Sequence, residues 1–305
     1  MAEALELGGY EVVGRLAVGG MAEVYQARAR ATTQRSPGEP EEVVLKRLHP
    51  SFRADASYVK AFVDEAKLTV RLRHPNIVRT YRLFKAGQDY LMVQELVSGR
   101  TLAFMQGLLM KVGTAMPPDA SCYIAWCTLK ALDYIHRAKV GENGANIVHR
   151  DVNPTNLLLG VQGDVKLTDF GVAEVEGMMQ GEAGALRGTV AYMSPEQVLG
   201  QSVDTRSDLY AVGVILWELL ASRRLFTGDG EAELMHRVRD ARAPLLSTLQ
   251  PELPDYAVQV VRKALFADKA RRFQSAADFI RALEVLARRS GWPLSVEALK
   301  PLLGG

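Results

Sequence analysis

The sequence predicts an α+β fold of two lobes, a small one rich in strands and a larger one that is mainly helical. The first observation is the length of 305 residues, which is too long for one small core. The second is a change of pattern near Ser98, because short strands precede it and helical periodicity follows it. The composition, 48% hydrophobic and 24% charged residues, is that of an ordinary globular chain.

Five short strands and one helix are expected in the first lobe. The strands are expected at Tyr10–Leu16, Tyr25–Ala27, Val43–Lys46, Ile77–Phe84 and Tyr90–Glu95. The helix is expected over Ala56–Arg73 and ends before Pro75, since a proline pushes the preceding residue out of the helical region. Residues 30–42 are expected to form a polar loop with no core-forming pattern.

The expected helix carries one acid on its apolar face. Phe62 lies three residues before Glu65, while Leu68 and Leu72 lie three and seven residues after it. These spacings place all four residues on one side of a helix, so Glu65 is expected to point inward. The alternative is a free surface glutamate.

The stretch from His149 to Gly171, HRDVNPTNLLLGVQGDVKLTDFG, predicts a loop, a β-hairpin and a second loop. A hairpin brings its two ends together, so Asp151, Asn156 and Asp169 are expected to share one pocket. Oxygen-bearing side chains without cysteine suit a hard divalent cation such as Mg²⁺ that also needs phosphate oxygens. The sequence therefore predicts a site for a metal and a phosphorylated ligand.

The tripeptides HRD and DFG, in this order and with Pro154 and Asn156 at the same spacing, resemble the signature of the protein kinases. Either tripeptide alone could arise by chance in an unrelated fold. The resemblance covers roughly Tyr10 to Ala287 and implies the bilobal protein kinase fold. It implies an N-lobe over residues 10–97, a C-lobe over residues 98–289 and a C-terminal tail over residues 290–305.

The same resemblance implies ATP and Mg²⁺ as cofactors and a protein as substrate. Asp151 would orient the acceptor hydroxyl and take its proton, and Lys46, partnered by Glu65, would hold the α- and β-phosphates. Asn156 and Asp169 would hold Mg²⁺. The glycine-rich loop, backbone groups of the hinge and apolar residues around the adenine would complete the nucleotide site, and these are Gly19, Gly20, Glu95, Val97, Val24, Val44 and Leu158.

Two departures from the family pattern affect this interpretation. The glycine-rich loop has Ala17 and Ala22 where the family has its first and third glycines, so an ordinary hairpin turn is the alternative there. Asn153 stands where Ser/Thr kinases carry a lysine that touches the transferring phosphate. An amide brings no positive charge, and the loss could lower the rate by roughly 10²–10³. Tyrosine kinases instead place an arginine at the position of Thr155.

Residues 172–187, VAEVEGMMQGEAGALR, match the kinase activation segment but contain no Ser, Thr or Tyr. Phosphorylation of such a segment adds charge that pairs with an arginine matching Arg150, and that route is absent before Thr189. Three alternatives stay open: fixed negative charge from the glutamates of the segment, an activating protein partner, or an unregulated loop. Two further matches, a Glu196–Arg272 pair and Asp208 as a brace of the catalytic loop, are expected to be structural.

An active Ser/Thr protein kinase of the bacterial, eukaryotic-type group is the favoured function, because Pro154 and the Gly188–Thr189 pair look like the Ser/Thr branch. The alternative is a pseudokinase that binds a nucleotide and serves as a scaffold or interaction module, which Asn153, the two alanines and the missing phosphorylation site favour. A net charge of +2, with acids and bases mixed, gives no reason to expect a nucleic-acid or membrane partner. The N-terminus lacks a signal-peptide pattern and the two cysteines suit a reducing compartment, so a cytoplasmic protein is expected.

Overall fold

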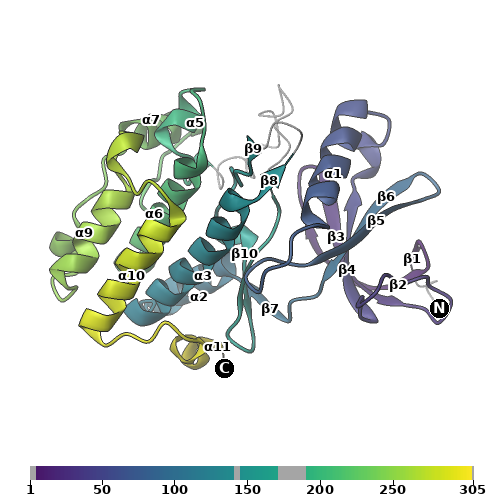
Figure 1. The fold of residues 1–305 in the computed structure, drawn as a ribbon, viewed down its shortest axis with the longest axis horizontal. Helices are drawn as coiled ribbons and strands as arrows, with labels where there is room; N and C mark the ends of the chain where they lie inside the picture. The colour runs from purple at the N-terminus through teal and green to yellow at the C-terminus, as the bar shows by residue number, and fades with distance from the viewer. Residues whose placement is uncertain (1–4, 141–144, 171–189, 304–305) are drawn as a thin grey trace. The chain divides into compact units, whose positions relative to one another are not determined.

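The computed structural model describes residues 5–140, 145–170 and 190–303. These residues divide into two compact units, residues 5–97 with Phe170, and residues 98–169 with 190–303. The first unit is a sheet with one long helix, and the second is mainly helical (Figure 1). The predicted α+β fold, with one strand-rich and one mainly helical part, is confirmed.

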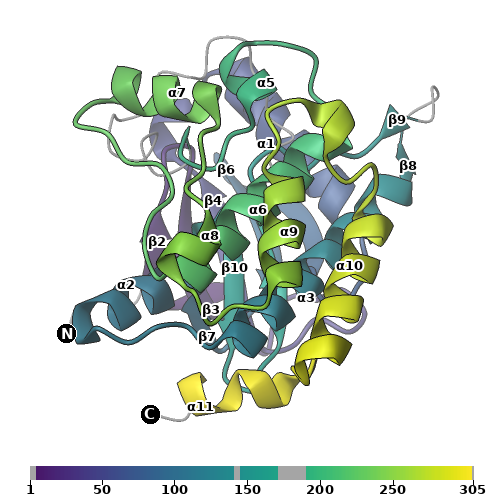
Figure 2. The same cartoon turned by 90° about the vertical axis from the view of Figure 1, so that its left-hand side faces the viewer.

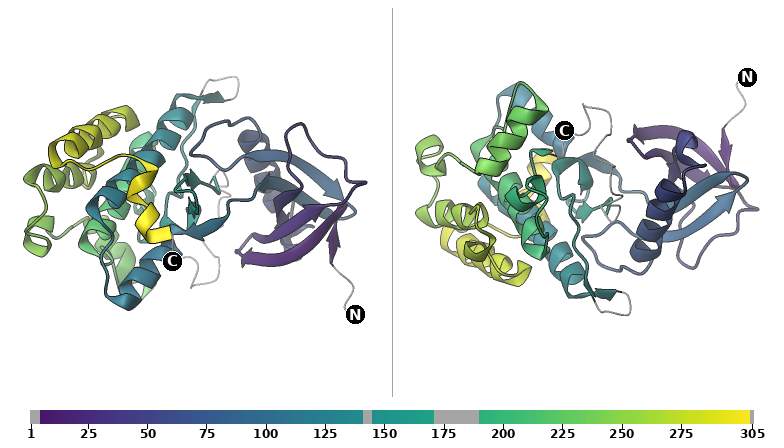
Figure 3. Two further views of the ribbon diagram at one scale, coloured as in Figure 1. Left: turned by 90° about the horizontal axis from the view of Figure 1, so that it is seen from below. Right: turned by 90° about the horizontal axis from the view of Figure 1, so that it is seen from above.

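Six strands form the antiparallel sheet of the first unit, in the spatial order β1-β2-β3-β4-β6-β5. They are β1 Glu6–Leu7, β2 Tyr10–Val18, β3 Ala22–Ala29, β4 Glu42–Leu48, β5 Thr80–Ala86 and β6 Asp89–Glu95. Helix α1, Ala56–Thr69, lies on one face of this sheet, with the short 3-10 helix η1, Pro50–Phe52, before it (Figure 3). On that face, Phe62 and Ala66 of α1 pack against Ala22, Leu48 and Met92.

Helix α1 starts where it was predicted and ends earlier. Asp55 caps its N-terminus, because the carboxylate accepts a hydrogen bond from the backbone N–H of Ser57. The predicted end at Arg73 was wrong, since the helix stops at Thr69. The following residues tighten into turns, in which Leu72 N donates to Thr69 O at 3.1 Å.

The polar loop of residues 30–42 is attached to the sheet through one buried acid. Glu39 is 6% exposed although the loop carries no core-forming pattern. Its carboxylate accepts hydrogen bonds from the Tyr10 hydroxyl, from Arg82 Nε at 3.2 Å and from the backbone N–H of Ser36 at 2.9 Å. Burial, with the Glu39 hydrogen bond, raises the pKa of Tyr10 to about 12. Three donors stabilise a carboxylate that would otherwise be too costly to bury.

The second unit is built around a helix that is buried on all sides. Every residue of helix α6, Thr205–Ala221, is buried from Ser207 onward, as expected for a helix that is apolar around its whole circumference. Helix α3, Pro118–Arg137, packs against α6 and against α10, Ala276–Ser290 (Figure 2). The other helices are α2 Leu102–Val112, α5 Pro195–Val198, α7 Glu231–Asp240, α8 Leu246–Leu249, α9 Asp255–Ala264 and α11 Lys300–Leu303, with 3-10 helices η2 Pro154–Asn156, η4 Lys269–Arg271 and η5 Val296–Ala298.

Short strands complete the second unit. They are β7 Gly99–Thr101, β8 Lys139–Val140, β9 Ala145–Asn146, β10 Leu157–Gly160 and β11 Val165–Leu167. Strands β10 and β11 form the predicted hairpin, with Leu157 opposite Leu167, and β7 pairs with the other edge of β10. The C-terminal residues pack on this unit, because Leu299 is fully buried next to η5.

Candidate active site

A buried ion pair joins the sheet of the first unit to its helix. Lys46 on β4 donates from Nζ to Oε1 of Glu65 on α1 at 2.7 Å, and the two residues are 7% and 3% exposed. Glu65 lies on the buried side of α1 together with Phe62, as the helical spacing indicated. The pair holds the ammonium group at a fixed position on the sheet.

Two of the predicted adenine-contacting residues share a face of the sheet with Lys46. Val24 on β3 lies directly opposite Lys46, and Val44 precedes Lys46 by two residues on β4. Opposed residues and residues two apart point to the same side of a sheet. Glu95 ends β6, where its N–H donates to Arg79 O at 2.8 Å, and Val97 is the last residue of the first unit before the chain enters the second.

The glycine-rich loop is shorter than the predicted turn. Strand β2 continues to Val18 and β3 begins at Ala22, so only three residues lie between the strands. Gly19 N donates to Ala22 O at 2.8 Å and closes the turn, and a side chain at Gly20 would meet no atom within 4 Å. Ala22 is 6% exposed and packs with Phe62, so alanine at this position is part of the hydrophobic core.

In the second unit, two amides hold the carboxylate of Asp151. Asn153 donates from Nδ2 to Oδ1 of Asp151 at 2.8 Å, and Asn156 donates from Nδ2 to Oδ2 at 2.9 Å. The other end of the Asn153 amide is also occupied, since its Oδ1 accepts from the backbone N–H of Thr155 at 2.9 Å and caps η2. Asn153 is 3% exposed, so its amide is committed to the loop itself.

The loop that carries Asp151 is anchored to α6 by Asp208. The carboxylate of Asp208 accepts from the backbone N–H groups of His149 and Arg150, at 2.9 and 2.8 Å, and contacts Nε2 of His136 at 2.8 Å. Arg150 has a left-handed backbone, with φ of 69°, which is uncommon for a residue other than glycine. The two backbone bonds to Asp208 stabilise this conformation.

His149 is a neutral, structural residue. It is fully buried, and burial lowers the pKa of its imidazole below the ordinary value. Nε2 lies 3.2 Å from Thr168 O, which can only accept, and Nδ1 accepts from the backbone N–H of Asp151 at 3.3 Å. One donor and one acceptor are what a neutral imidazole offers. The ring therefore links the catalytic loop to the end of the hairpin.

The hairpin places the two predicted metal ligands at its open end. Thr168 N donates to Asn156 O at 3.0 Å, and Asp169 follows directly with φ of 55°. The side-chain nitrogen of Asn156 donates to Asp151, so the side-chain oxygen Oδ1 of Asn156 is the atom that would coordinate a cation. One carboxylate and one amide oxygen fit Mg²⁺ if phosphate oxygens complete the shell. No cluster of three His, Cys, Asp or Glu side chains occurs among the described residues.

Leu158, the remaining predicted nucleotide contact, lies on β10 opposite Thr101.

A second buried ion pair stabilises the helical unit after residue 190. Arg272 donates from two nitrogens to the two oxygens of Glu196, both at 2.7 Å, and Ser207 donates to Glu196 at 2.6 Å. Glu196 and Arg272 are 3% and 1% exposed. Burial alone would raise the pKa of Glu196, but the hydrogen bonds from Arg272 and Ser207 outweigh it and hold that pKa below its ordinary value.

Sequence reasoning missed two residues that support the catalytic loop. Gln197 donates from Nε2 to Arg150 O at 2.9 Å, and its N–H and side chain also form a capping box with Ser194. The Ser194–Gln197 spacing is a recognisable capping signal, although it does not reveal the bond to Arg150. His136 contacts Asp208, and no local pattern in the sequence indicates this contact. The segment 172–187 and Thr189 lie outside the described residues.

Comparison with known proteins decides the family. A sequence profile of the protein kinase domain matches residues 10–283. The chain belongs to the protein kinase family. This kinase is 36% identical to the probable serine/threonine-protein kinase SCO3848 of Streptomyces coelicolor, over 98% of this chain and 42% of the relative. It is 32% identical to the tyrosine-protein kinase MasK of Myxococcus xanthus, over 91% of this chain and 43% of the relative.

Two Mycobacterium tuberculosis proteins extend the comparison. The kinase is 34% identical to the serine/threonine-protein kinase PknL, over 93% of this chain and 67% of PknL. The crystal structure of the PknI kinase domain matches with a TM-score of 0.67 and 28% identity, over 94% of this chain and 99% of that structure. The kinase thus spans less than half the length of SCO3848 and MasK. None of its described helices combines the length and apolarity that crossing a bilayer requires.

Proposed function

We propose that this kinase transfers the γ-phosphoryl group of ATP to serine or threonine hydroxyls of protein substrates. The observation that supports this most directly is the Asp151 carboxylate, which is oriented by Asn153 and Asn156 in a loop anchored to Asp208. A fixed carboxylate can orient a hydroxyl and take its proton. We also propose an N-lobe over residues 10–97, a C-lobe over residues 98–289 and a C-terminal tail over residues 290–305.

The other residues have the roles of binding and positioning. Lys46, held by Glu65, binds the α- and β-phosphates of ATP, and Asn156 with Asp169 holds Mg²⁺, which neutralises phosphate charge when bound. The nucleotide contacts are completed by the glycine-rich loop, the hinge backbone and the apolar residues, namely Gly19, Gly20, Glu95, Val97, Val24, Val44 and Leu158. Since the reaction consumes ATP, we place it in the cytoplasm, and an activating protein partner is one way to order the activation segment.

Asn153 sets a limit on the rate rather than abolishing the reaction. Its amide holds Asp151 but carries no charge for the transferring phosphate. A pseudokinase is not favoured, because Lys46, Glu65, Asp151, Asn156 and Asp169 are all present and the relatives are named as kinases. Whether the phosphoryl group goes to Ser/Thr or to Tyr needs a separate argument, since MasK is named as a tyrosine kinase. Pro154 and Gly188–Thr189 support the Ser/Thr assignment.

The test measures transfer from labelled ATP with Mg²⁺ to three peptides that differ only in a Ser, Thr or Tyr acceptor. We expect labelling of the Ser and Thr peptides, and none with the Asp151→Asn or Lys46→Met variants. Labelling of the Tyr peptide alone would overturn the acceptor assignment. Nucleotide binding without transfer above the level of the two variants would establish the pseudokinase instead.

A further inference from the structure

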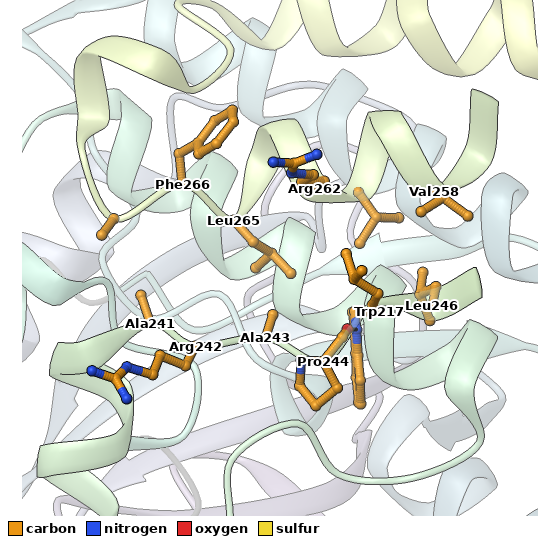
Figure 4. A pocket seen from close by; sticks show the side chains of 13 residues that line it. Trp217, Ala241, Arg242, Ala243, Pro244, Leu246, Val258, Arg262, Leu265 and Phe266 are labelled. Atoms are coloured by element: carbon orange, nitrogen blue, oxygen red, sulfur yellow. Dashed lines mark hydrogen bonds between the residues drawn. The ribbon is translucent and has the colours of Figure 1, made fainter. Parts of the chain in front are cut away.

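A pocket lies in the helical unit, outside the candidate active site. It has a volume of about 340 Å³ and is formed by α6, α8, α9 and the loop after α7 (Figure 4). This volume is at the low end of the roughly 300–1,000 Å³ that ligand pockets span, so it suits one or two side chains of a peptide. We name it the α6–α9 pocket and define it by Trp217, Pro244, Leu246, Val261 and Leu265.

The floor of the α6–α9 pocket is apolar and firmly held. Trp217, Val261 and Leu246 are 1%, 1% and 2% exposed. Trp217 donates from Nε1 to Pro244 O at 3.0 Å, which fixes the loop after α7 against α6. Leu245 at the edge is 53% exposed. A bulky apolar side chain placed in the pocket would be removed from water.

The rim of the pocket is cationic. Arg242 and Arg262 line it from two different elements, and no acid lines it (Figure 4). Two further guanidinium groups stack on its aromatic residues, Arg223 over the Trp217 ring at 5.7 Å and Arg271 over the Phe266 ring at 4.0 Å. None of these four arginines forms an ion pair within the part of the chain that the structure describes.

The arginines that follow Arg223 and Arg271 in the sequence do form ion pairs, so the lack of an ion pair is not common to all arginines of this region. Arg224, next to Arg223, pairs with Glu218 at 3.0 Å, and Arg272, next to Arg271, pairs with Glu196 at 2.7 Å. In each doublet one arginine pairs with an acid of the fold, and the other lies over an aromatic ring that lines the pocket. The pocket therefore presents an apolar floor inside an uncompensated positive rim.

We propose that the α6–α9 pocket docks an acidic segment of a protein substrate, with one bulky apolar side chain on the floor and flanking carboxylates on the arginines. That the docked protein is a substrate rests on the proposed kinase function, whereas the docking of an acidic segment does not. A nucleic acid fits less well, because the two aromatic rings of the pocket, Trp217 and Phe266, each already carry a guanidinium group over the ring where a base would stack. Helix α6 carries both Trp217 and Asp208, nine residues apart or roughly 14 Å along the axis, so docking here would bring substrate to the unit that holds Asp151.

The direct test is fluorescence anisotropy with the full chain and a labelled peptide in which a Leu-Phe pair is flanked on each side by two glutamates. We expect saturable binding, and Arg242→Glu or Arg262→Glu should weaken it about fivefold each. Arg288→Glu is the matched control, because Arg288 is exposed on α10 outside the lining and should leave binding unchanged. Peptides with lysines for the glutamates, or with Ala-Ala for Leu-Phe, should not bind.

Absence of binding, or equal binding by the charge-reversed variants, would overturn the docking site. Tighter binding of a single-stranded oligonucleotide that displaces the peptide would do the same and would assign the surface to nucleic acid. Joining the acidic peptide to an acceptor peptide should lower KM and leave kcat unchanged. Peptide binding in a chain that phosphorylates no substrate would refute the kinase function and leave the docking site intact.

Discussion

Asn153 donates a hydrogen bond from its side-chain amide to Oδ1 of Asp151 at 2.8 Å. The residue that replaces the family's lysine is therefore part of the support of the carboxylate that we propose to be catalytic. Its other end caps η2, so Asn153 is held between Asp151 and Thr155. The kinase loop here combines firm positioning with a missing positive charge, and these two properties can be separated by mutation.

Replacing Asn153 tests both properties. Asn153→Ala removes the donor to Asp151 and should lower kcat about tenfold to a hundredfold, by analogy with the loss of one preorganised donor. Asn153→Lys restores a cation that can also donate to Asp151, so kcat should exceed that of the wild type. Steady-state phosphoryl transfer with a Ser peptide measures both, beside thermal melts that report folding. A lysine variant no faster than the wild type would show that the missing charge does not limit the rate.

Variants of the Lys46–Glu65 pair should show that stability can be recovered without activity. Glu65→Gln removes the carboxylate that accepts the hydrogen bond of the buried ammonium, and it should cost about 3–5 kcal/mol of unfolding free energy as well as activity. The double variant Lys46→Met, Glu65→Leu replaces both ions by apolar groups and should recover most of that stability. It should still transfer no phosphate. Urea unfolding together with the transfer assay checks this, and recovered activity in the double variant would refute the role of Lys46.

The Glu196–Arg272 pair predicts a pH dependence of stability. The pKa of Glu196 is held below its ordinary value in the fold, so the carboxylate stabilises the fold above the unfolded pKa, about 4.5. This contribution is lost as the pH falls through the folded pKa. The wild type should therefore exceed Glu196→Gln in unfolding free energy at pH 7, and the difference should shrink below about pH 4.5. Glu252→Gln, at an exposed position, is the control, and a difference that does not vary with pH would contradict the prediction.

Ser222 offers a stabilising change at the end of α6. Its backbone is left-handed, with φ of 53° and ψ of 31°, and its hydroxyl oxygen is buried without a hydrogen-bond partner in the described structure. Ser222→Gly removes both costs and should add about 1 kcal/mol of unfolding free energy. Ser222→Ala removes only the hydroxyl, so glycine should be the more stable of the two in thermal melts. Equal melting temperatures would show that the left-handed backbone carries no cost here.

The sequence by itself determined the features that depend on residues close together in the chain. HRD, DFG and the hairpin between them predicted Asp151, Asn156 and Asp169 as site residues, and a helical period was enough to place Glu65 on the buried side of its helix. The predicted hairpin is present as β10 and β11. Such features are set by residues within one turn or one strand pair, so a single stretch of sequence contains the information.

The tertiary structure alone decided the contacts between residues that are distant in sequence. Glu39 belongs to a polar loop, yet it is buried because Tyr10 and Arg82 supply donors from two separate strands. The α6–α9 pocket likewise collects its lining from α6, α8, α9 and the loop after α7. No local pattern indicates whether an arginine will meet an acid, because the partner comes from elsewhere in the fold. Folding therefore decided which charges of this protein are neutralised and which remain available for a partner.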